Sequence, residues 1–444
     1  MYFLLIVIIS LLAIFTFKLY TNDLLCPASI VLLMFLICSI SGLMQWKEYN
    51  YIEYSATSVF YILLGIFTFL LGCIIPYILY SHQINHLLSN AREQRKERIE
   101  ISPLILLIAI FISLIAIVLF YKFEAATVGM STSPISNLPK IINKYHYAEQ
   151  FWDTVNMPSS LNYLLKAGQI FSTLSVFVLI YNSSFKVFNK KDIYHMVIIF
   201  LYLILCILRS NRGSILILLS LAVYFLYFFW NMYYGWKSSV NRKIMKWMIM
   251  AAISFLILFF VLILITGRKQ SLAEINIRSY LWAYTGGGIR CFDLFIKNPV
   301  HSNDMFGYET FFSINRALYN FFGRGSAYLR HLEFRQINGV DISNVYTSFR
   351  RFYSDFGIGG LIILPLIQGL LFTTLYMYCK KRALKGQITF GILLFGYLSH
   401  SLFYMPIDDM FYSSVLAVGS APRVLILYIL FKYLPRIQFQ KRIK

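Results

Sequence analysis

The sequence predicts an all-α integral membrane protein with about eleven transmembrane helices and a large helical loop on the outer side. Apolar residues make up 59% of the 444 residues, and charged residues make up only 13%. A soluble domain carries about 25% charged residues, so this composition argues against a soluble fold. Membrane spans need about 20 consecutive apolar residues, and they are helical because lipid offers no partner for free backbone groups.

Eleven runs along the chain have the length and composition of a membrane span, and together they predict a single transmembrane domain over residues 1–444. The first run is not followed by a cleavage site, so it is expected to be an anchor rather than a signal peptide. The runs cover residues 1–18, 25–44, 56–80, 101–121, 161–181, 193–208, 214–234, 247–266, 357–379, 388–405 and 411–431.

Lysine and arginine predict which loops face the cytoplasm, because cytoplasmic loops carry an excess of both. Five loops that fall on one side of the eleven-span count hold twenty of the forty basic residues. We therefore expect an outer N-terminus and a cytoplasmic C-terminus. Attraction of these loops to anionic lipid headgroups accounts for much of the net charge of +21, so the charge does not indicate nucleic-acid binding. The five loops are residues 81–100, 182–192, 235–246, 380–387 and 432–444.

The outer segment 267–356 has the opposite basic composition, with nine arginines and two lysines, whereas the cytoplasmic loops have thirteen lysines and seven arginines. Membrane insertion treats the two residues alike. Only arginine offers a planar group that pairs with phosphate or carboxylate through two parallel hydrogen bonds. The segment therefore predicts a bound anionic ligand. Alternatively, its arginines pair with acids of the same segment, namely Glu274, Asp293, Asp304, Glu309, Glu333, Asp341 and Asp355.

Local patterns divide the outer segments further. Residues 273–284 and 289–296 predict short helices separated by three glycines, which indicate a hinge or a close backbone approach. Apolar residues at helical spacing over 311–322 predict a helix with one apolar face. That face is expected either on the outer leaflet or against the transmembrane helices. Residues 122–160 contain three prolines and predict an irregular flap.

Several charged side chains stand at the outer ends of spans. Arg209 and Arg212 flank the short loop between the sixth and seventh spans, where they would either anchor in the headgroups or form a paired guanidinium site. Arg351 and Asp355 are four residues apart on one predicted helix, so they would either pair with each other or serve a ligand. Arg423, inside the last predicted span, needs a partner such as Asp408, Asp409 or a ligand phosphate. The two neighbouring aspartates are otherwise expected to cap a loop.

Cysteine and histidine spacing predicts neither a disulfide framework nor a metal site. Four of the six cysteines fall inside predicted spans, a fifth, Cys379, ends one, and Cys291 has no partner on its side. No HExxH motif and no His/Cys cluster occurs. We therefore expect no metal and no cofactor.

Four segments carry a resemblance to a known family. They are residues 209–213 (RSNRG), 284–292 (YTGGGIRCF), 306–316 (FGYETFFSINR) and 344–359 (NVYTSFRRFYSDFGIG). In this order, with a large outer loop before a late span, they resemble the Wzy-type oligosaccharide repeat-unit polymerases of O-antigen and capsule pathways. The resemblance covers roughly residues 202–369, and the rest of the chain is similar in hydropathy only.

Members of this family take a glycan repeat unit on undecaprenyl pyrophosphate at the outer face of the bacterial plasma membrane. They transfer the growing chain onto the next lipid-linked unit and release undecaprenyl pyrophosphate, with no nucleotide sugar and no known metal. The resemblance thus implies a metal-independent membrane glycosyltransferase of the inner membrane, active in O-antigen, lipopolysaccharide or capsule biosynthesis. Its implied partners are undecaprenyl-pyrophosphate-linked glycans, membrane lipid and a chain-length regulator protein. Family N-termini are often inside, which departs from the orientation expected here.

The implied reaction assigns roles to candidate residues. Arginines would bind the leaving pyrophosphate more tightly as its charge grows, and a carboxylate or imidazole would take the proton of the acceptor hydroxyl. The candidate bases are Asp355, His331 and Glu309, followed by Glu149 and Asp153. The candidate substrate-binding residues are Arg209, Arg212, Arg268, Arg278, Arg290, Arg350 and Arg351 for pyrophosphate, with Trp152, Trp282, Tyr346 and Tyr353 for sugar stacking.

Two other functions stay open. An O-antigen ligase would share the large outer loop and its arginines but use a different acceptor. A polysaccharide flippase or another transporter would be a different class of protein. Transporters commonly show inverted repeats and helices broken at the midplane, and the sequence shows no internal symmetry.

Overall fold

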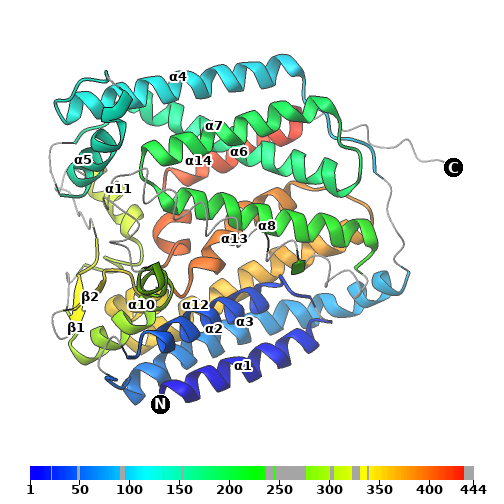
Figure 1. The fold of residues 1–444 in the computed structure, drawn as a ribbon. Helices are drawn as coiled ribbons and strands as arrows, with labels where there is room; N and C mark the ends of the chain where they lie inside the picture. Colours follow the sequence, from blue (N-terminus) through cyan, green and yellow to red (C-terminus); the bar gives the residue numbers. More distant parts are fainter. Residues whose placement is uncertain are drawn as a thin grey trace. The chain divides into compact units, whose positions relative to one another are not determined.

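The computed structural model is almost entirely helical (Figure 1). Eight of its helical segments are long and apolar enough to cross a membrane, so the chain has the fold of an α-helical membrane protein. They are Tyr2–Leu19, Pro27–Met44, Ala56–Ser89, Pro103–Thr127, Ser159–Ser184, Lys190–Leu208, Gly213–Tyr234 and Ser348–Leu384. The structure describes residues 1–21, 23–47, 51–90, 96–133, 135–151, 155–236, 245–246, 250, 277–300, 305–322, 331–337 and 340–434.

These eight helices coincide with eight of the eleven predicted spans. The predicted span 388–405 is the shorter helix α13 (Phe390–Tyr404). The prediction of one continuous span over 411–431 is wrong, because a π-helical turn (Phe411–Val415) is separated from α14 (Ser420–Tyr433) by a break at 416–419. The predicted span 247–266 lies, apart from Met250, outside the described residues.

The chain divides into two compact units. Unit 1 comprises residues 1–90 and 276–422, and unit 2 comprises residues 91–275 and 423–444. Unit 1 is built on α1 (Tyr2–Leu19), α2 (Pro27–Met44), α3 (Ala56–Ser89) and α12 (Ser348–Leu384), followed by α13.

Helices α3 and α12 pack closely along much of their length because glycines face backbone there. A Cβ atom on Gly72 would lie 2.1 Å from the carbonyl oxygen of Leu366, and one on Gly369 would lie 2.2 Å from that of Phe69. Such close approach through small residues is typical of helix pairs in membranes.

Specific contacts distinguish the two ends of unit 1. At one end the rings of Tyr2 and Tyr54 stack 3.8 Å apart. We call this the Tyr54 end, and α3 and α12 both begin there. At the other end, Asp23 accepts hydrogen bonds from the Tyr376 hydroxyl at 2.7 and 2.8 Å and an ion pair from Lys380 at 2.5 Å. The Asp23 contacts tie the segment before α2 to the last turns of α12.

One helix, α10 (Ile277–Lys297), covers the Tyr54 end. The prediction that three glycines split this stretch into two helices is wrong, because α10 runs through them. The predicted close backbone approach is confirmed, since a Cβ on Gly286 would lie 2.5 Å from the amide nitrogen of Gly42 and one on Gly288 would lie 2.7 Å from the carbonyl oxygen of Pro406. The glycines allow α10 to approach α2 and the loop after α13.

Short elements complete the Tyr54 end. The helix expected near 311–322 is present as α11 (Phe312–Phe322). Phe311 packs against Phe356 and Tyr412 of unit 1, whereas Phe321 at the other end of α11 is 83% exposed. Strands β1 (Arg335–Ile337) and β2 (Val340–Ser343) form an antiparallel pair. Helix α12 changes direction at Gly357, whose φ of 58° and ψ of −144° separate the segment 348–356 from the long helix that follows.

Unit 2 contains α4 (Pro103–Thr127), α5 (Leu138–Phe151), α6 (Ser159–Ser184), α7 (Ile193–Leu208) and α8 (Arg212–Tyr234), with α14 from Arg423 onward. Aromatic rings fill its core, where Phe177 contacts Phe225, Phe229 and Phe431 edge-on. The irregular flap predicted at 122–160 is wrong in part: α4 continues to Thr127, and α5 is a regular helix of 14 residues.

Candidate functional site: a buried network of arginines and acids

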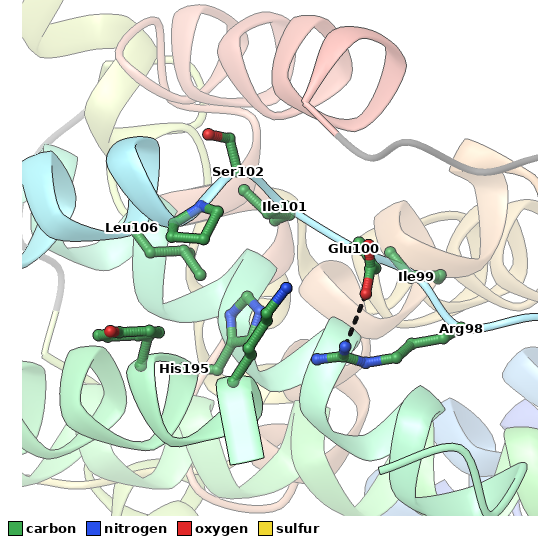
Figure 2. Close-up of a pocket in the computed structure, with 10 residues that line it drawn as sticks. Arg98, Ile99, Glu100, Ile101, Ser102, Leu106 and His195 are labelled. Carbon is green, nitrogen blue, oxygen red and sulfur yellow. Dashed lines mark hydrogen bonds and ion pairs between the residues drawn. The ribbon is translucent and has the colours of Figure 1, made fainter. Parts of the chain in front are cut away.

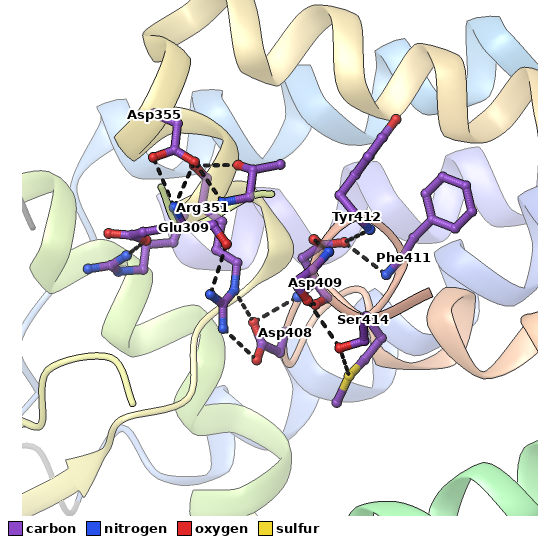
Figure 3. Close-up of polar contacts among 12 residues, drawn as sticks. Glu309, Arg351, Asp355, Asp408, Asp409, Phe411, Tyr412 and Ser414 are labelled. Atoms are coloured by element: carbon purple, nitrogen blue, oxygen red, sulfur yellow. Dashed lines mark hydrogen bonds and ion pairs between the residues drawn. The ribbon is translucent and has the colours of Figure 1, made fainter. Parts of the chain in front are cut away.

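A network of charged side chains lies at the Tyr54 end of unit 1 (Figure 3). The short segment at the start of α12 supplies three of its members within six residues, and its first amide, that of Ser348, donates to the carbonyl oxygen of Met405 at 2.9 Å. This contact sets the segment beside the loop after α13. We call the network the unit 1 cluster; its members are Glu309, Glu333, Arg335, Arg350, Arg351, Asp355, Asp408 and Asp409.

Arg350 is the most enclosed cation of the cluster, with 1% of its surface exposed. Its guanidinium pairs with Glu309, which is fully buried, and with Glu333 at 2.5 Å. The rings of Phe295 and Tyr346 lie 4.6 and 4.9 Å from its central carbon. Desolvation of this charge is thus offset by two carboxylates and by contact with aromatic faces.

Arg351 pairs with Asp408, not with the predicted partner Asp355. Its Nε and one terminal nitrogen donate to the two oxygens of Asp408 at 2.7 and 3.0 Å, and the other terminal nitrogen donates to the carbonyl oxygen of Glu309 at 3.2 Å (Figure 3). The spacing along one helix predicted Asp355 as the partner. Instead, Asp408 in the loop after α13 accepts two parallel hydrogen bonds from Arg351.

Asp355 is occupied by backbone donors. Its carboxylate accepts the amide of Glu309 at 3.2 and 3.1 Å and that of Thr310 at 2.6 Å, while the Thr310 hydroxyl donates to the carbonyl oxygen of Arg351 at 3.1 Å. These contacts fix the turn before α11 on the start of α12. Desolvation by burial raises the pKa of Asp355, although the Thr310 donors and Arg351 act in the opposite direction.

Asp409 caps the π-helical turn, as the sequence analysis expected. Its carboxylate accepts the amides of Phe411, Tyr412 and Ser413 at 3.0, 3.1 and 2.9 Å. Desolvation by burial raises the pKa of Asp409 to about 7, although Arg351 and the amides act in the opposite direction. The cap and the Arg351–Asp408 pair together fix the loop between α13 and the turn.

Arg290 is fully buried in a separate structural contact at the Tyr54 end. It lies 3.6 Å from the center of the Tyr54 ring, donates to the carbonyl oxygen of Ile52 at 2.7 Å and pairs with Asp293 at 3.4 Å. Asp293 also accepts the amide of Ser55 at 2.8 Å. Arg290 therefore joins α10 to the segment before α3.

The remaining described candidates are spread over this end. Tyr346 is buried and donates from its hydroxyl to the carbonyl oxygen of Glu333 at 2.9 Å. The Tyr353 ring lies 5.0 Å from that of Tyr61. His331 is exposed, with its ring 5.2 Å from that of Phe334. Outside the described residues lie all of Arg268, Trp152 and Asp153, together with the side chains of Arg212, Arg278 and Trp282.

Arg209 belongs to unit 2, where it follows the last turn of α7. It interacts electrostatically with Glu124 at the end of α4 and with Glu149 on α5. Glu149 was a predicted base of lower rank. Glu124 was not predicted, because a single acid at the end of an apolar run is typical of the end of a membrane span. Arg423, also in unit 2, contacts Gln169 at 3.4 Å. Of the partners expected for it, Asp408 binds Arg351 and Asp409 caps the π-helical turn.

A pocket of about 180 Å³ lies at the opposite end of α4 and α7 (Figure 2). Arg98 at its edge pairs with Glu100 at 2.7 Å and with Asp192 at 3.0 Å. These acids satisfy its charge and hold the segment before α4 against the turn before α7. The pocket is lined by Arg98, Ile99, Glu100, Ile101, Ser102, Pro103, Leu106, Lys191, Tyr194 and His195.

Arg350 pairs with two acids of its own segment, as the alternative for the arginine-rich segment expected, whereas Arg351 pairs with Asp408 outside that segment. Among the described residues, no group of three or more His, Cys, Asp and Glu side chains is placed to hold a metal ion. No protein-family model, no curated protein and no solved structure matches the chain.

Proposed function

We propose that this chain polymerises oligosaccharide repeat units carried on undecaprenyl pyrophosphate, at the outer face of a bacterial plasma membrane. The observation that carries the proposal is spatial. Three of the four sequence segments behind the resemblance, 284–292, 306–316 and 344–359, pack against one another at the Tyr54 end of unit 1. They are separated along the chain, so their meeting supports a common role.

Direct contacts join the three segments. The first segment lies against the third, since a Cβ on Gly288 would lie 3.6 Å from the backbone carbonyl carbon of Tyr346. Glu309 of the second segment binds Arg350 of the third, and the amide of Thr310 binds Asp355. A site assembled in this way at one end of membrane-length helices suits a substrate whose lipid stays in the bilayer and whose glycan is in water.

The reaction makes two chemical demands. The acceptor hydroxyl loses its proton and its oxygen bonds to the anomeric carbon of the growing chain. The bond from that carbon to the pyrophosphate oxygen breaks, and undecaprenyl pyrophosphate leaves with the electron pair. Guanidinium groups stabilise the charge that develops on the leaving group, and a carboxylate takes the proton.

The contacts divide the predicted arginines into two groups. We assign Arg290, Arg350 and Arg351 to holding the loops at the Tyr54 end, because acids or carbonyl oxygens accept from their terminal guanidinium nitrogens. We assign Arg209 and Arg212, in the fourth segment, to the leaving pyrophosphate. The Arg209 guanidinium makes no hydrogen bond or ion pair with another described residue, so we infer that its donors serve a phosphate ligand.

The test is reconstitution of the purified protein in liposomes with lipid-linked repeat units. A polymerase extends these units into a ladder when they are the only substrate. A ligase leaves them unextended until a different acceptor is supplied, and a flippase moves them across the bilayer without joining them. Either of the last two results would replace the proposal.

A further inference from the structure

The ends of three helices in unit 2 bring two carboxyl groups, a phenol and a guanidinium together. Glu124 lies in the last turn of α4, Tyr145 and Glu149 lie one turn apart on α5, and Arg209 follows α7. Arg209 interacts electrostatically with both glutamates and with the Tyr145 hydroxyl, and the two glutamates interact with each other. We call these four residues the unit 2 cluster.

Aromatic packing fixes this arrangement. The Tyr145 ring lies 5.7 Å from that of Phe120 and 5.9 Å from that of Phe123, both edge-on. Phe120 is one turn before Glu124 on α4, so the contact sets α5 against the last turns of α4. Because Glu149 is one turn after Tyr145, the same contact directs Glu149 toward the end of α4.

Glu124 is fully buried, and neither of its carboxyl oxygens has a hydrogen-bond partner among the described residues. The Tyr145 hydroxyl is likewise buried without a partner in the described part of the chain. An unpaired buried carboxylate is costly enough that such a group binds a proton or a ligand instead. Glu149, in contrast, is exposed.

Two interacting carboxyl groups titrate as a pair, since the charge on one disfavours the charge on the other. The buried member then keeps the first proton, and the exposed member carries the charge. Partial desolvation raises the pKa of Glu149, while Arg209 lowers it. In the described part of the chain, neither glutamate accepts a hydrogen bond from a backbone amide, as Asp355 does, or from a guanidinium, as Glu309 does.

We propose that Glu124 and Glu149 form a carboxyl pair that accepts the proton of the acceptor hydroxyl, beside the arginine that binds the leaving pyrophosphate. This inference rests on the proposed function and deepens it. At rest the pair holds one proton on Glu124. When the acceptor oxygen bonds to the anomeric carbon, its proton passes to Glu149, the pyrophosphate leaves, and Glu149 then releases the proton to water. Glu149 is the catalytic base, and Glu124 is a positioning residue that keeps the second charge away.

The activity test compares three neutral replacements in the reconstituted protein. Glu149→Gln lowers the rate of chain extension on the order of 100-fold or more, while binding of the lipid-linked donor persists. Glu124→Gln keeps an uncharged side chain at position 124, so it lowers the rate of chain extension less than Glu149→Gln does. Glu100→Gln, at the opposite end of α4, is the matched control and keeps full activity. Wild-type rates in both Glu149→Gln and Glu124→Gln, in a protein that polymerises, overturn the carboxyl pair and leave the proposed function standing.

A second measurement does not depend on activity. Infrared difference spectra at neutral pH detect the carbonyl stretch of a protonated carboxyl group. All proteins in this comparison carry Asp409→Asn, because Asp409, with its pKa raised to about 7, would contribute a band of its own. In this background the spectrum of the substrate-free protein contains the band, Glu124→Gln removes it, and Glu100→Gln preserves it. A band that persists in Glu124→Gln, or that is absent from the background protein, overturns the pair whatever the activity. A wild type that joins no repeat units, although the background protein shows the band, overturns the proposed function, and with it the catalytic role of Glu149.

Discussion

Arg351 and Asp408 form a two-pronged ion pair, at 2.7 and 3.0 Å, that links the start of α12 to the loop after α13. The pair is largely enclosed, with 12% of the arginine and 28% of the aspartate side chain exposed. It determines where the loop lies, because the adjacent Asp409 caps the π-helical turn from the same loop. The same pair leaves Asp355 to the amides of Glu309 and Thr310.

Removing either partner of this pair should destabilise unit 1 by about 1–3 kcal/mol, since the remaining charge is left partly enclosed without its partner. We expect Arg351→Ala and Asp408→Ala to lower the thermal midpoint of the purified protein in detergent. The double variant should lose much less than the sum of the two single losses. Additive losses would show that the two side chains do not interact.

The glycine run in α10 permits a matched comparison. Gly286→Ala places a Cβ 2.5 Å from a backbone nitrogen of α2, so we expect a loss of about 1–3 kcal/mol from overpacking. Gly287→Ala is the control, because its Cβ would meet its nearest neighbour, Ser343, at 3.5 Å. Alanine there should be neutral or stabilising by up to about 1 kcal/mol, from helix propensity. Equal thermal midpoints for the two variants would contradict the close packing of α10 on α2.

Asp409 predicts a pH dependence of stability. Its pKa is raised to about 7, above the value of about 4 expected in the unfolded chain. A raised carboxyl pKa means that the folded protein binds the proton more tightly. Its contribution to stability is therefore full below about pH 4 and is lost as pH rises to about 7. The thermal midpoint of the wild type should fall more steeply between pH 5 and pH 7 than that of Asp409→Asn, and parallel curves would argue against the shift.

Hydropathy predicted the spans well because burial in lipid requires long apolar helices, whatever their partners. It failed at 411–431, where apolar composition continues across the break after the π-helical turn. The three glycines at 286–288 correctly predicted a close backbone approach, but the predicted break between two helices is wrong because α10 runs through them. Ion pairs were the least predictable feature: Arg351 could meet Asp355 by spacing, but its partner depends on a loop 57 residues away. The role of Glu124 could not be predicted from the sequence, since a single acid at the end of an apolar run is also found where a helix simply ends.

Membrane orientation is a separate prediction from the basic loops. A reporter enzyme that works only outside the cytoplasm should be active when fused after Ser302 and silent when fused after Lys243. The reason is the excess of lysine and arginine in loops such as 235–246. Fusions at both sites should be present at equal levels on immunoblots. The reverse pattern of activity would place the arginine-rich segment in the cytoplasm.

We propose that the chain joins lipid-linked repeat units and releases one undecaprenyl pyrophosphate for each unit added. The most direct measurement follows glycan length and free lipid pyrophosphate together, in liposomes that contain the purified protein and lipid-linked units as the only substrate. We predict a ladder of products with one pyrophosphate lipid released per joined unit. Arg209→Ala should reduce both signals by at least about 100-fold, and Lys191→Ala, an exposed basic residue at the opposite end of unit 2, should leave both intact. A folded, membrane-inserted wild type that yields neither longer glycans nor free lipid pyrophosphate would contradict the claim.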